Sequence, residues 1–246
     1  MSAAGADISL VIPVLDGERH ISAAVESARL QDPAPREIIV VDDGSTDGTA
    51  AIVRALPGIR YAWQPTGGPG AARNHGARLA TGELLAFLDA DDAWAPGKTA
   101  LQATLLREHP DVDLVVGHTQ RVVEAGSASP APVGDPVFFL HLGAMLVRRT
   151  AFDRVGAFEQ RPAGMGEDVD WFLRAKEIGL RMRFHREVVQ LHRYHEANMT
   201  RDRGAADRDL VRAFKRSVDR RRAQGAGATL AGWDEEMQWL DPEGGS

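Results

Sequence analysis

The chain has 246 residues, of which 43% are hydrophobic and 26% charged, and a formal net charge of -6 at pH 7. This length allows one large α/β domain or two small ones, and the acidic balance gives no overall reason to expect nucleic acid. No cysteine occurs, so disulfides, thiolate nucleophiles and cysteine zinc sites are excluded, and any metal must use oxygen or histidine ligands. The apolar run near residue 1 is too short for a signal peptide or a membrane span, so we expect a soluble, cytoplasmic protein whose membrane contact is at most peripheral.

The first part of the chain alternates strands with helices. Apolar, β-branched runs at Ile8–Val14, Glu37–Val41 and Ile59–Trp63 predict three strands. Apolar residues at helical spacing predict helices over about Glu18–Gln31 and around Ile52–Leu56. This order is typical of a parallel sheet with right-handed crossovers.

A fourth apolar run, Leu84–Leu88, ends in three closely spaced carboxylates, Asp89, Asp91 and Asp92. Such a run fits a strand buried on both faces, and open α/β sheets bind ligands at the carboxyl ends of their strands. Clustered acidic oxygens there suit a hard divalent ion that also binds substrate phosphates. The alternative is a polar turn in which Asp92 caps the next helix.

Two further groups lie at predicted strand ends. Asp42 and Asp43 follow the second strand, as the acidic cluster follows the fourth. After the third strand, the loop Thr66–Gly70 leads into a helix that carries Arg73. Main-chain N–H groups before a helix and a fixed positive charge suit an anion, although glycines before a helix can also serve geometry alone.

The chain changes character near residue 120. A helix after Pro96 and a strand over Asp113–Gln120 complete a nucleotide-type half, about residues 7–120. The segment Val123–Asp135 is rich in Ala, Ser, Pro and Gly and is predicted as a loop. A more irregular half, about residues 121–200, follows it.

The second half holds two sets of candidate site residues. Asp168 lies at a predicted helix start, where a carboxylate can serve simply as the N-cap. A predicted strand over Val188–Leu191 precedes His192 and His195, which can bind a metal or a phosphate. A pair of histidines can equally be surface decoration.

From residue 201 onward we expect a helical extension and an acidic tail. Leu210, Phe214 and Val218 recur on one face of a predicted helix. Its other face is basic, with Arg212, Lys215, Arg216, Arg220, Arg221 and Arg222. Such a face is usually solvated, but it can also rest on anionic lipid or an acidic acceptor.

Taken in order, five segments resemble the successive motifs of the family-2 inverting glycosyltransferases with the GT-A fold. They are Val11–Asp16, Val41–Thr49, Gly70–Gly76, Asp89–Asp92 and Gly166–Asp168. The resemblance implies a single GT-A domain over residues 7–200, with a Rossmann-like, mostly parallel sheet flanked by helices. The basic helix and acidic tail of residues 201–246 then form a C-terminal extension.

The same resemblance implies roles for residues at the nucleotide end of the site. The residues that line the base pocket are Pro13 and Leu15. Asp43 accepts hydrogen bonds from a uracil-type base, with Asp42 beside it, and Arg73 faces the diphosphate. The first motif departs from the family pattern, because Leu15–Asp16 stands where Tyr–Asn is common. The missing tyrosine ring would stack on the base, so without it the resemblance specifies the nucleotide less well.

The resemblance also implies a metal and a catalytic base. Of the D-x-D-D carboxylates Asp89, Asp91 and Asp92, one holds the ribose and another binds the Mn²⁺ or Mg²⁺ ion that bridges the phosphates. The segment with His192 and His195 matches the late histidine region that adds a metal or diphosphate contact. Asp168 matches the base that takes the proton from the acceptor hydroxyl.

The implied activity is a hexosyltransferase-type transfer from a nucleotide-diphosphate sugar by single displacement. A UDP-sugar is favoured and a GDP-sugar possible, while the acceptor is unknown: glycan, lipid-linked, peptide or small molecule. One alternative is a non-catalytic protein that binds nucleotide sugars. A sugar nucleotidyltransferase is less favoured, because Leu15–Arg19 lacks the glycine-rich, basic loop usual after the first strand of that class.

Overall fold

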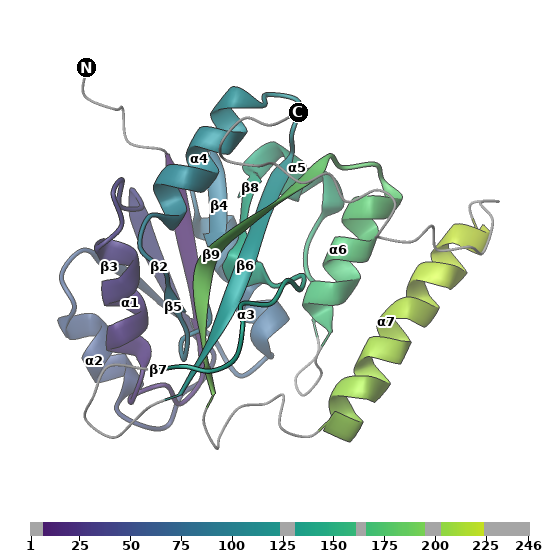
Figure 1. Cartoon of the computed structure of the whole chain (residues 1–246). Helices are drawn as coiled ribbons and strands as arrows, with labels where there is room; N and C mark the ends of the chain where they lie inside the picture. The colour runs from purple at the N-terminus through teal and green to yellow at the C-terminus, as the bar shows by residue number, and fades with distance from the viewer. Residues whose placement is uncertain (1–6, 124–130, 161–165, 195–202, 224–246) are drawn as a thin grey trace.

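The computed structural model describes residues 7–123, 131–160, 166–194 and 203–223. Predictions for His195 and for the tail beyond residue 223 lie outside these ranges. In the described part of the chain a nine-stranded sheet forms, with its main path in the order β3-β2-β1-β4-β8-β6-β9-β5 and with β7 paired to β6. Figure 1 shows this sheet between helices, with the long helix α7 at one side against α6.

The first four strands pair in parallel, as predicted. They are β1 (Ile8–Val14), β2 (Glu37–Asp42), β3 (Ile59–Trp63) and β4 (Leu84–Phe87). All of these pair in parallel, β2 and β4 with β1 and β3 with β2. The connecting helices are α1 (Ile21–Arg29), α2 (Thr49–Ala55) and α3 (Pro69–Leu79). The carboxyl ends of these strands therefore lie along one edge.

The described chain from Ala93 onward adds a mixed region. Its strands are β5 (Ala93–Trp94), β6 (Leu114–Val123), β7 (Ala131–Pro132), β8 (Met145–Arg148) and β9 (Met182–Tyr194). β8 is antiparallel to β4 and β6, while β6 and β9 are parallel. The helices are α4 (Lys98–Glu108), the short 3₁₀ helix η1 (Leu142–Ala144), α5 (Arg149–Val155), α6 (Glu167–Glu177) and α7 (Arg203–Ala223).

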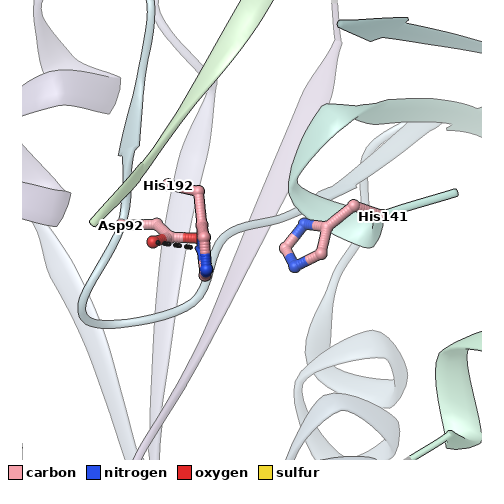
Figure 2. Close-up of side chains that lie close together, drawn as sticks. All are labelled: Asp92, His141 and His192. Carbon is pink, nitrogen blue, oxygen red and sulfur yellow. Dashed lines mark hydrogen bonds and ion pairs between the residues drawn. The ribbon is translucent and has the colours of Figure 1, made fainter. Parts of the chain in front are cut away.

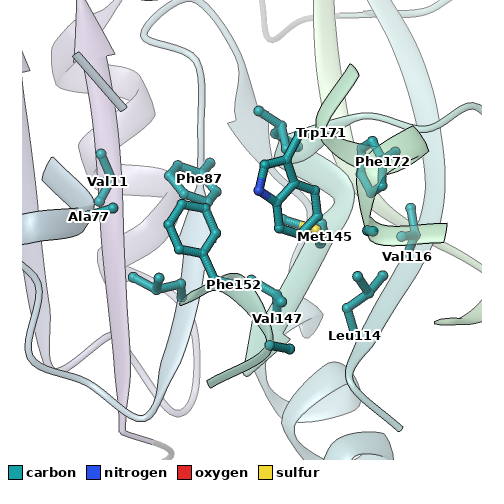
Figure 3. Packing of buried hydrophobic residues seen from close by; sticks show 14 of the residues in the cluster. Val11, Ala77, Phe87, Leu114, Val116, Met145, Val147, Phe152, Trp171 and Phe172 are labelled. Carbon is teal, nitrogen blue, oxygen red and sulfur yellow. The ribbon is translucent and has the colours of Figure 1, made fainter. Parts of the chain in front are cut away.

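Successive residues of a strand point to opposite faces, so the sheet separates two apolar cores. Ile12, together with Ile21 of α1 and Leu105 of α4, belongs to one core. The other contains Phe87 at the end of β4, Phe152 of α5 and Trp171 of α6, which are labelled in Figure 3. The Phe152 ring lies 5.8 Å from that of Phe87 and stacks 5.6 Å from that of Trp171. This aromatic column fixes α6 relative to the end of β4.

Two predicted boundaries in the second half are wrong. β6 continues to Val123, and Ala131–Pro132 pairs with it, so both ends of the predicted loop Val123–Asp135 contain strand residues. The late strand is β9, which extends well beyond Val188–Leu191. Polar and charged residues interrupt its apolar ones, so its length follows from its pairing with β6 rather than from a continuous apolar run.

The packed face of α7 also differs from the prediction. Ala213 and Ser217 are fully buried, whereas Leu210 is 39% exposed. Arg220 donates to Asp170 and Glu177 of α6 at 2.9 and 2.7 Å. The helix is oriented by ion pairs to the acidic side of α6, so part of the predicted basic face points inward. None of the described helices combines the length and hydropathy that crossing a membrane requires.

Candidate active site

The glycine loop before α3 holds the carboxylate of Asp43. The side chain is 3% exposed, and its Oδ1 accepts from Gln64 Nε2 at 2.7 Å and from the Gly67 N–H at 2.9 Å. Its Oδ2 accepts from the Gly68 N–H at 2.8 Å. The prediction that these N–H groups are free for an outside anion is therefore wrong for Gly67 and Gly68. The anion at this helix start belongs to the protein, where the helix dipole stabilises it.

Asp42 points into the protein and is 1% exposed. Its carboxylate accepts from the Ser45 N–H and from the Tyr61 hydroxyl, both at 2.7 Å. Burial and this carboxylate raise the pKa of Tyr61 to about 12. Asp42 thus holds the turn after β2 and the neighbouring strand together.

The first motif lies beside this turn. Pro13 is buried within β1 and pairs with Val41, while Leu15 is 51% exposed. Asp16 has a positive φ of 50° and accepts from the Thr46 N–H at 2.7 Å. The loops after β1 and β2 are therefore joined, with the Leu15 side chain left on the surface.

Arg73 links the end of β4 to the start of α6. It is 6% exposed, donates to Asp89 Oδ1 at 2.6 Å and also donates to the Glu167 carboxylate. Burial raises the pKa of Asp89, but Arg73, His141 and His192 together hold it below its usual value. For Glu167, burial raises the pKa above its usual value although Arg73 opposes this, and the neighbouring Asp168 adds to the rise. Arg73 therefore neutralises two acidic groups from distant parts of the chain.

Asp168 lies in the first turn of α6, as predicted, but it is not the helix cap. Gly166 occupies the N-cap position with a φ of 86°. The half-buried Asp168 carboxylate accepts from the Val169 N–H at 2.7 Å. By contrast, Asp170, two residues further along α6, accepts from Arg174 at 2.9 Å and from Arg220 at 2.9 Å.

Asp92 is the most enclosed member of the D-x-D-D cluster, with 1% of its surface exposed. It accepts from Gln190 Nε2 at 2.6 Å, from the Arg193 N–H at 2.9 Å and from His192 Nδ1 at 3.1 Å. The alternative of a cap for the next helix is wrong, because Gly97 takes the N-cap position of α4. Asp92 instead joins the end of β4 to β9.

His192 is oriented by this carboxylate. Its Nδ1–H points to Asp92, which leaves Nε2 as the nitrogen available to a ligand. Burial lowers the pKa of His192, but the hydrogen bond to Asp92 and the charges of Asp92, Asp91 and Asp89 raise it above its usual value. Asp91 and Asp89 are partly exposed beside it.

His141 completes the group and was not predicted from the sequence. One ligand atom from each of Asp92, His141 and His192 lies within 4.8 Å of the others, and Figure 2 shows the two rings beside the carboxylate. His141 Nδ1 accepts from the Gly143 N–H at 3.1 Å, so the neutral ring carries its proton on Nε2. That Nε2 lies 3.6 Å from Asp89 Oδ2. The Nε2–H of His141 is thus directed, as a hydrogen-bond donor, toward anionic oxygen.

The turn that carries His141 is anchored from behind by α4. The buried Lys98 donates to the Met145 carbonyl at 3.2 Å, and Gln102 donates to the Ala144 carbonyl at 2.9 Å. A lone histidine before a glycine in an otherwise apolar segment was the one signal for this residue. Nothing in the local pattern indicates that it faces Asp89.

Comparison with known proteins identifies the family. Residues 9–132, about half of the chain, match the model described as glycosyl transferase family 2. The chain belongs to this family. The predicted family and the GT-A type of α/β fold are therefore confirmed.

Relatives with curated names agree with the family. An uncharacterised glycosyltransferase of Nostoc is 33% identical over 134 residues, which is 50% of this chain and 42% of that protein. The succinoglycan biosynthesis protein ExoU of Rhizobium meliloti is 29% identical over 211 residues, 73% of this chain and 60% of that protein. The chain thus spans less than two thirds of the length of these relatives.

Two solved structures have the same fold at 21% identity. TarS of S. aureus in complex with UDP-GlcNAc has a TM-score of 0.70 and covers 87% of this chain, which covers 66% of that structure. The mannosyltransferase PcManGT of Pyrobaculum calidifontis, in complex with GDP-Man and Mn²⁺, has a TM-score of 0.68 with coverages of 88% and 65%. At this identity the likeness shows the fold.

Proposed function

We propose that this chain transfers a sugar from a nucleoside-diphosphate donor to an acceptor hydroxyl, with a divalent ion and with inversion at the anomeric carbon. The observation that carries the proposal is the link made by Arg73. It joins the acidic end of β4, beside His192, to the Glu167–Asp168 pair of α6. A metal-type acidic cluster and a separate carboxylate are thereby held on either side of one guanidinium. This division of acidic groups suits leaving-group stabilisation on one side and proton removal on the other.

The ion would be held by His192 Nε2 with Asp91 and Asp89. Asp92 already accepts three hydrogen bonds from the protein, so its role is to orient His192. Carboxylate oxygens with one imidazole suit Mn²⁺, with Mg²⁺ as the second choice. When bound, the ion neutralises charge on the diphosphate leaving group. The Nε2–H of His141 would add a hydrogen-bond donor to the diphosphate oxygens.

Asp168 is the proposed catalytic base, because its acidic neighbours are engaged by arginines. Glu167 is engaged by Arg73, and Asp170 is engaged by Arg174 and Arg220. The Asp168 carboxylate, in contrast, accepts from a main-chain N–H and is half-buried. It is therefore the acidic side chain of this turn best able to take a proton from the attacking hydroxyl.

The nucleotide is expected at the edge formed by β1, β2 and the glycine loop, with Asp43 as the residue that reads the base. The solved TarS and PcManGT structures contain UDP-GlcNAc and GDP-Man respectively, which supports a nucleotide sugar as the donor here. A UDP-sugar is the favoured donor and a GDP-sugar the second choice.

The test is release of UDP or GDP from a panel of nucleotide sugars with Mn²⁺, for the wild type and Asp168→Asn. We expect the variant to lose about 10²- to 10⁴-fold in turnover, because asparagine cannot take a proton. Because Asp168 is not the helix cap, stability and nucleotide affinity should stay near wild type, which thermal unfolding and calorimetry would report. Undiminished turnover in Asp168→Asn would exclude it as the base. Nucleotide binding that is equal in excess chelator would exclude the metal, and absence of any release by the wild type would favour a binding protein.

A further inference from the structure

The carboxylate of Asp43 has a limited capacity for outside ligands. An ionised carboxylate offers about four acceptor positions, two on each oxygen. Oδ1 accepts from Gln64 Nε2 and from the Gly67 N–H, at 2.7 and 2.9 Å. Oδ2 accepts from the Gly68 N–H at 2.8 Å. Among the described residues these are the donors to Asp43, so Oδ1 is filled and Oδ2 can take one more hydrogen bond.

The orientation of the Gln64 amide is held from its other end. His75 Nδ1 lies 3.0 Å from Gln64 Oε1. An amide oxygen only accepts, so the proton of the His75 ring lies on Nδ1 and points to it. Desolvation, with a contribution from Arg78, lowers the pKa of His75, and the ring is therefore neutral at pH 7. A flipped amide would set its NH₂ group against the His75 N–H and its oxygen against the Asp43 carboxylate. The donor that fills Oδ1 is thus fixed by a relay from His75 through Gln64 to Asp43.

Bases differ in how many acceptor positions they need. Uracil presents one N–H, at N3, between two carbonyl oxygens. Guanine presents two donors side by side, the N1–H and the exocyclic amino group, which pair with both oxygens of a carboxylate. The single position on Oδ2 satisfies uracil. Guanine also needs an acceptor position on Oδ1, and that position is already occupied by the Gln64 amide.

We propose that Gln64, held by His75, is a specificity-determining residue that makes the site prefer uridine over guanosine diphosphates. The inference rests on the proposed function, in which Asp43 reads the base. Gln64 and His75 would then set the preference for one base in a site that has Leu15 where the family commonly has tyrosine. Specificity here arises from excluding the wrong partner as well as from binding the right one.

The experiment measures affinities for UDP and GDP by calorimetry with Mn²⁺, in the wild type, Gln64→Met and Gln64→Ala. The wild type should bind UDP more tightly. In both variants the ratio of the two affinities should move toward GDP by about tenfold or more, because a hydrogen-bond position on a charged acceptor becomes available. Gln64→Met keeps the bulk of the side chain, so a shift in this variant cannot come from added space. His75→Phe should shift the ratio in the same direction by less.

Gln120→Met is the matched control, because the Gln120 amide donates to main-chain carbonyls of Arg121, Val133 and Gly134 away from Asp43. Thermal unfolding of each variant verifies that it is folded. A ratio that is unchanged in both Gln64 variants, or a wild type that prefers GDP, overturns the inference. If neither diphosphate binds the wild type, the proposed function itself fails, and the inference fails with it.

Discussion

The two acidic ends of the site are held by partners at very different distances along the chain. The donors to Asp43 come from residues 21, 24 and 25 positions away, and two of them are main-chain N–H groups. The donors to Asp92 come from 98, 100 and 101 positions away and include two side chains. Arg73 reaches 94 positions to Glu167. The end of the site around Asp43, where the nucleobase is expected, is thus built by one strand–loop–helix unit. The metal end around Asp92 forms only once β9 and α6 have docked.

This difference predicts which end of the site a substitution disturbs. A change in the second half of the chain should disturb the region of Asp89, Asp91 and Asp92 and leave the Asp43 carboxylate in place. A change in the glycine loop should do the reverse.

Arg73→Met should have the largest effect on stability. It removes the guanidinium that neutralises Asp89 and Glu167, and leaving the buried Glu167 carboxylate without its partner costs about 3–5 kcal/mol of the free energy of unfolding. The loss should shrink as the pH falls, because the buried Glu167 then binds a proton more readily in the folded than in the unfolded state. Denaturant unfolding at pH 7.5 and at pH 5 measures both effects.

Arg36→Met provides the control. Arg36 pairs with Asp7 at 2.9 Å, and its side chain is 55% exposed. Exposed pairs contribute about 0–1 kcal/mol, so this variant should stay close to the wild type. An Arg73→Met variant as stable as Arg36→Met would mean that the link between β4 and α6 is not made through Arg73.

Asp92→Asn should weaken the metal end without abolishing it. The variant loses the charge that orients His192, and loss of such an orienting carboxylate typically lowers metal affinity about 10- to 100-fold. Titration with Mn²⁺ in the presence of UDP would measure this, with Asp111→Asn as a surface control that pairs with Arg181. If Asp92→Asn abolishes Mn²⁺ binding as fully as Asp91→Asn, Asp92 is a direct ligand rather than an orienting residue.

Much of the first half could be predicted from its sequence because its signals are local. Ile8–Val14 and Ile59–Trp63 are strands residue for residue as expected. A strand buried on both faces needs a continuous apolar run, and a carboxylate after such a run must lie at the carboxyl edge of the sheet. Both are readable without knowing the partners.

The remainder depends on contacts between distant residues. His141 and Gln64 are single polar side chains in ordinary surroundings, and their roles follow from Asp89 and Asp43, which lie elsewhere in the chain. The arginines of α7 look alike in sequence, yet Arg216 and Arg220 face acidic groups of the domain while Arg222 is exposed. Neither periodicity nor composition distinguishes a paired arginine from a solvated one.

The smallest predicted effect tests the Asp92–His192 contact through pH. The pKa of His192 is raised above its usual value of 6.5 by its hydrogen bond to Asp92, against the effect of burial. A raised pKa in the folded state means that protonated His192 contributes stability fully below about pH 6.5, and that this contribution is lost as the pH rises through the folded value. His192→Gln should therefore cost on the order of 1 kcal/mol near pH 6 and less near pH 9, measured by denaturant unfolding in excess chelator. His109→Gln, at the end of α4, controls for the substitution itself. A cost that is constant or that grows with pH would show that the ring is held as a neutral group, and the charge on Asp92 would then need another partner.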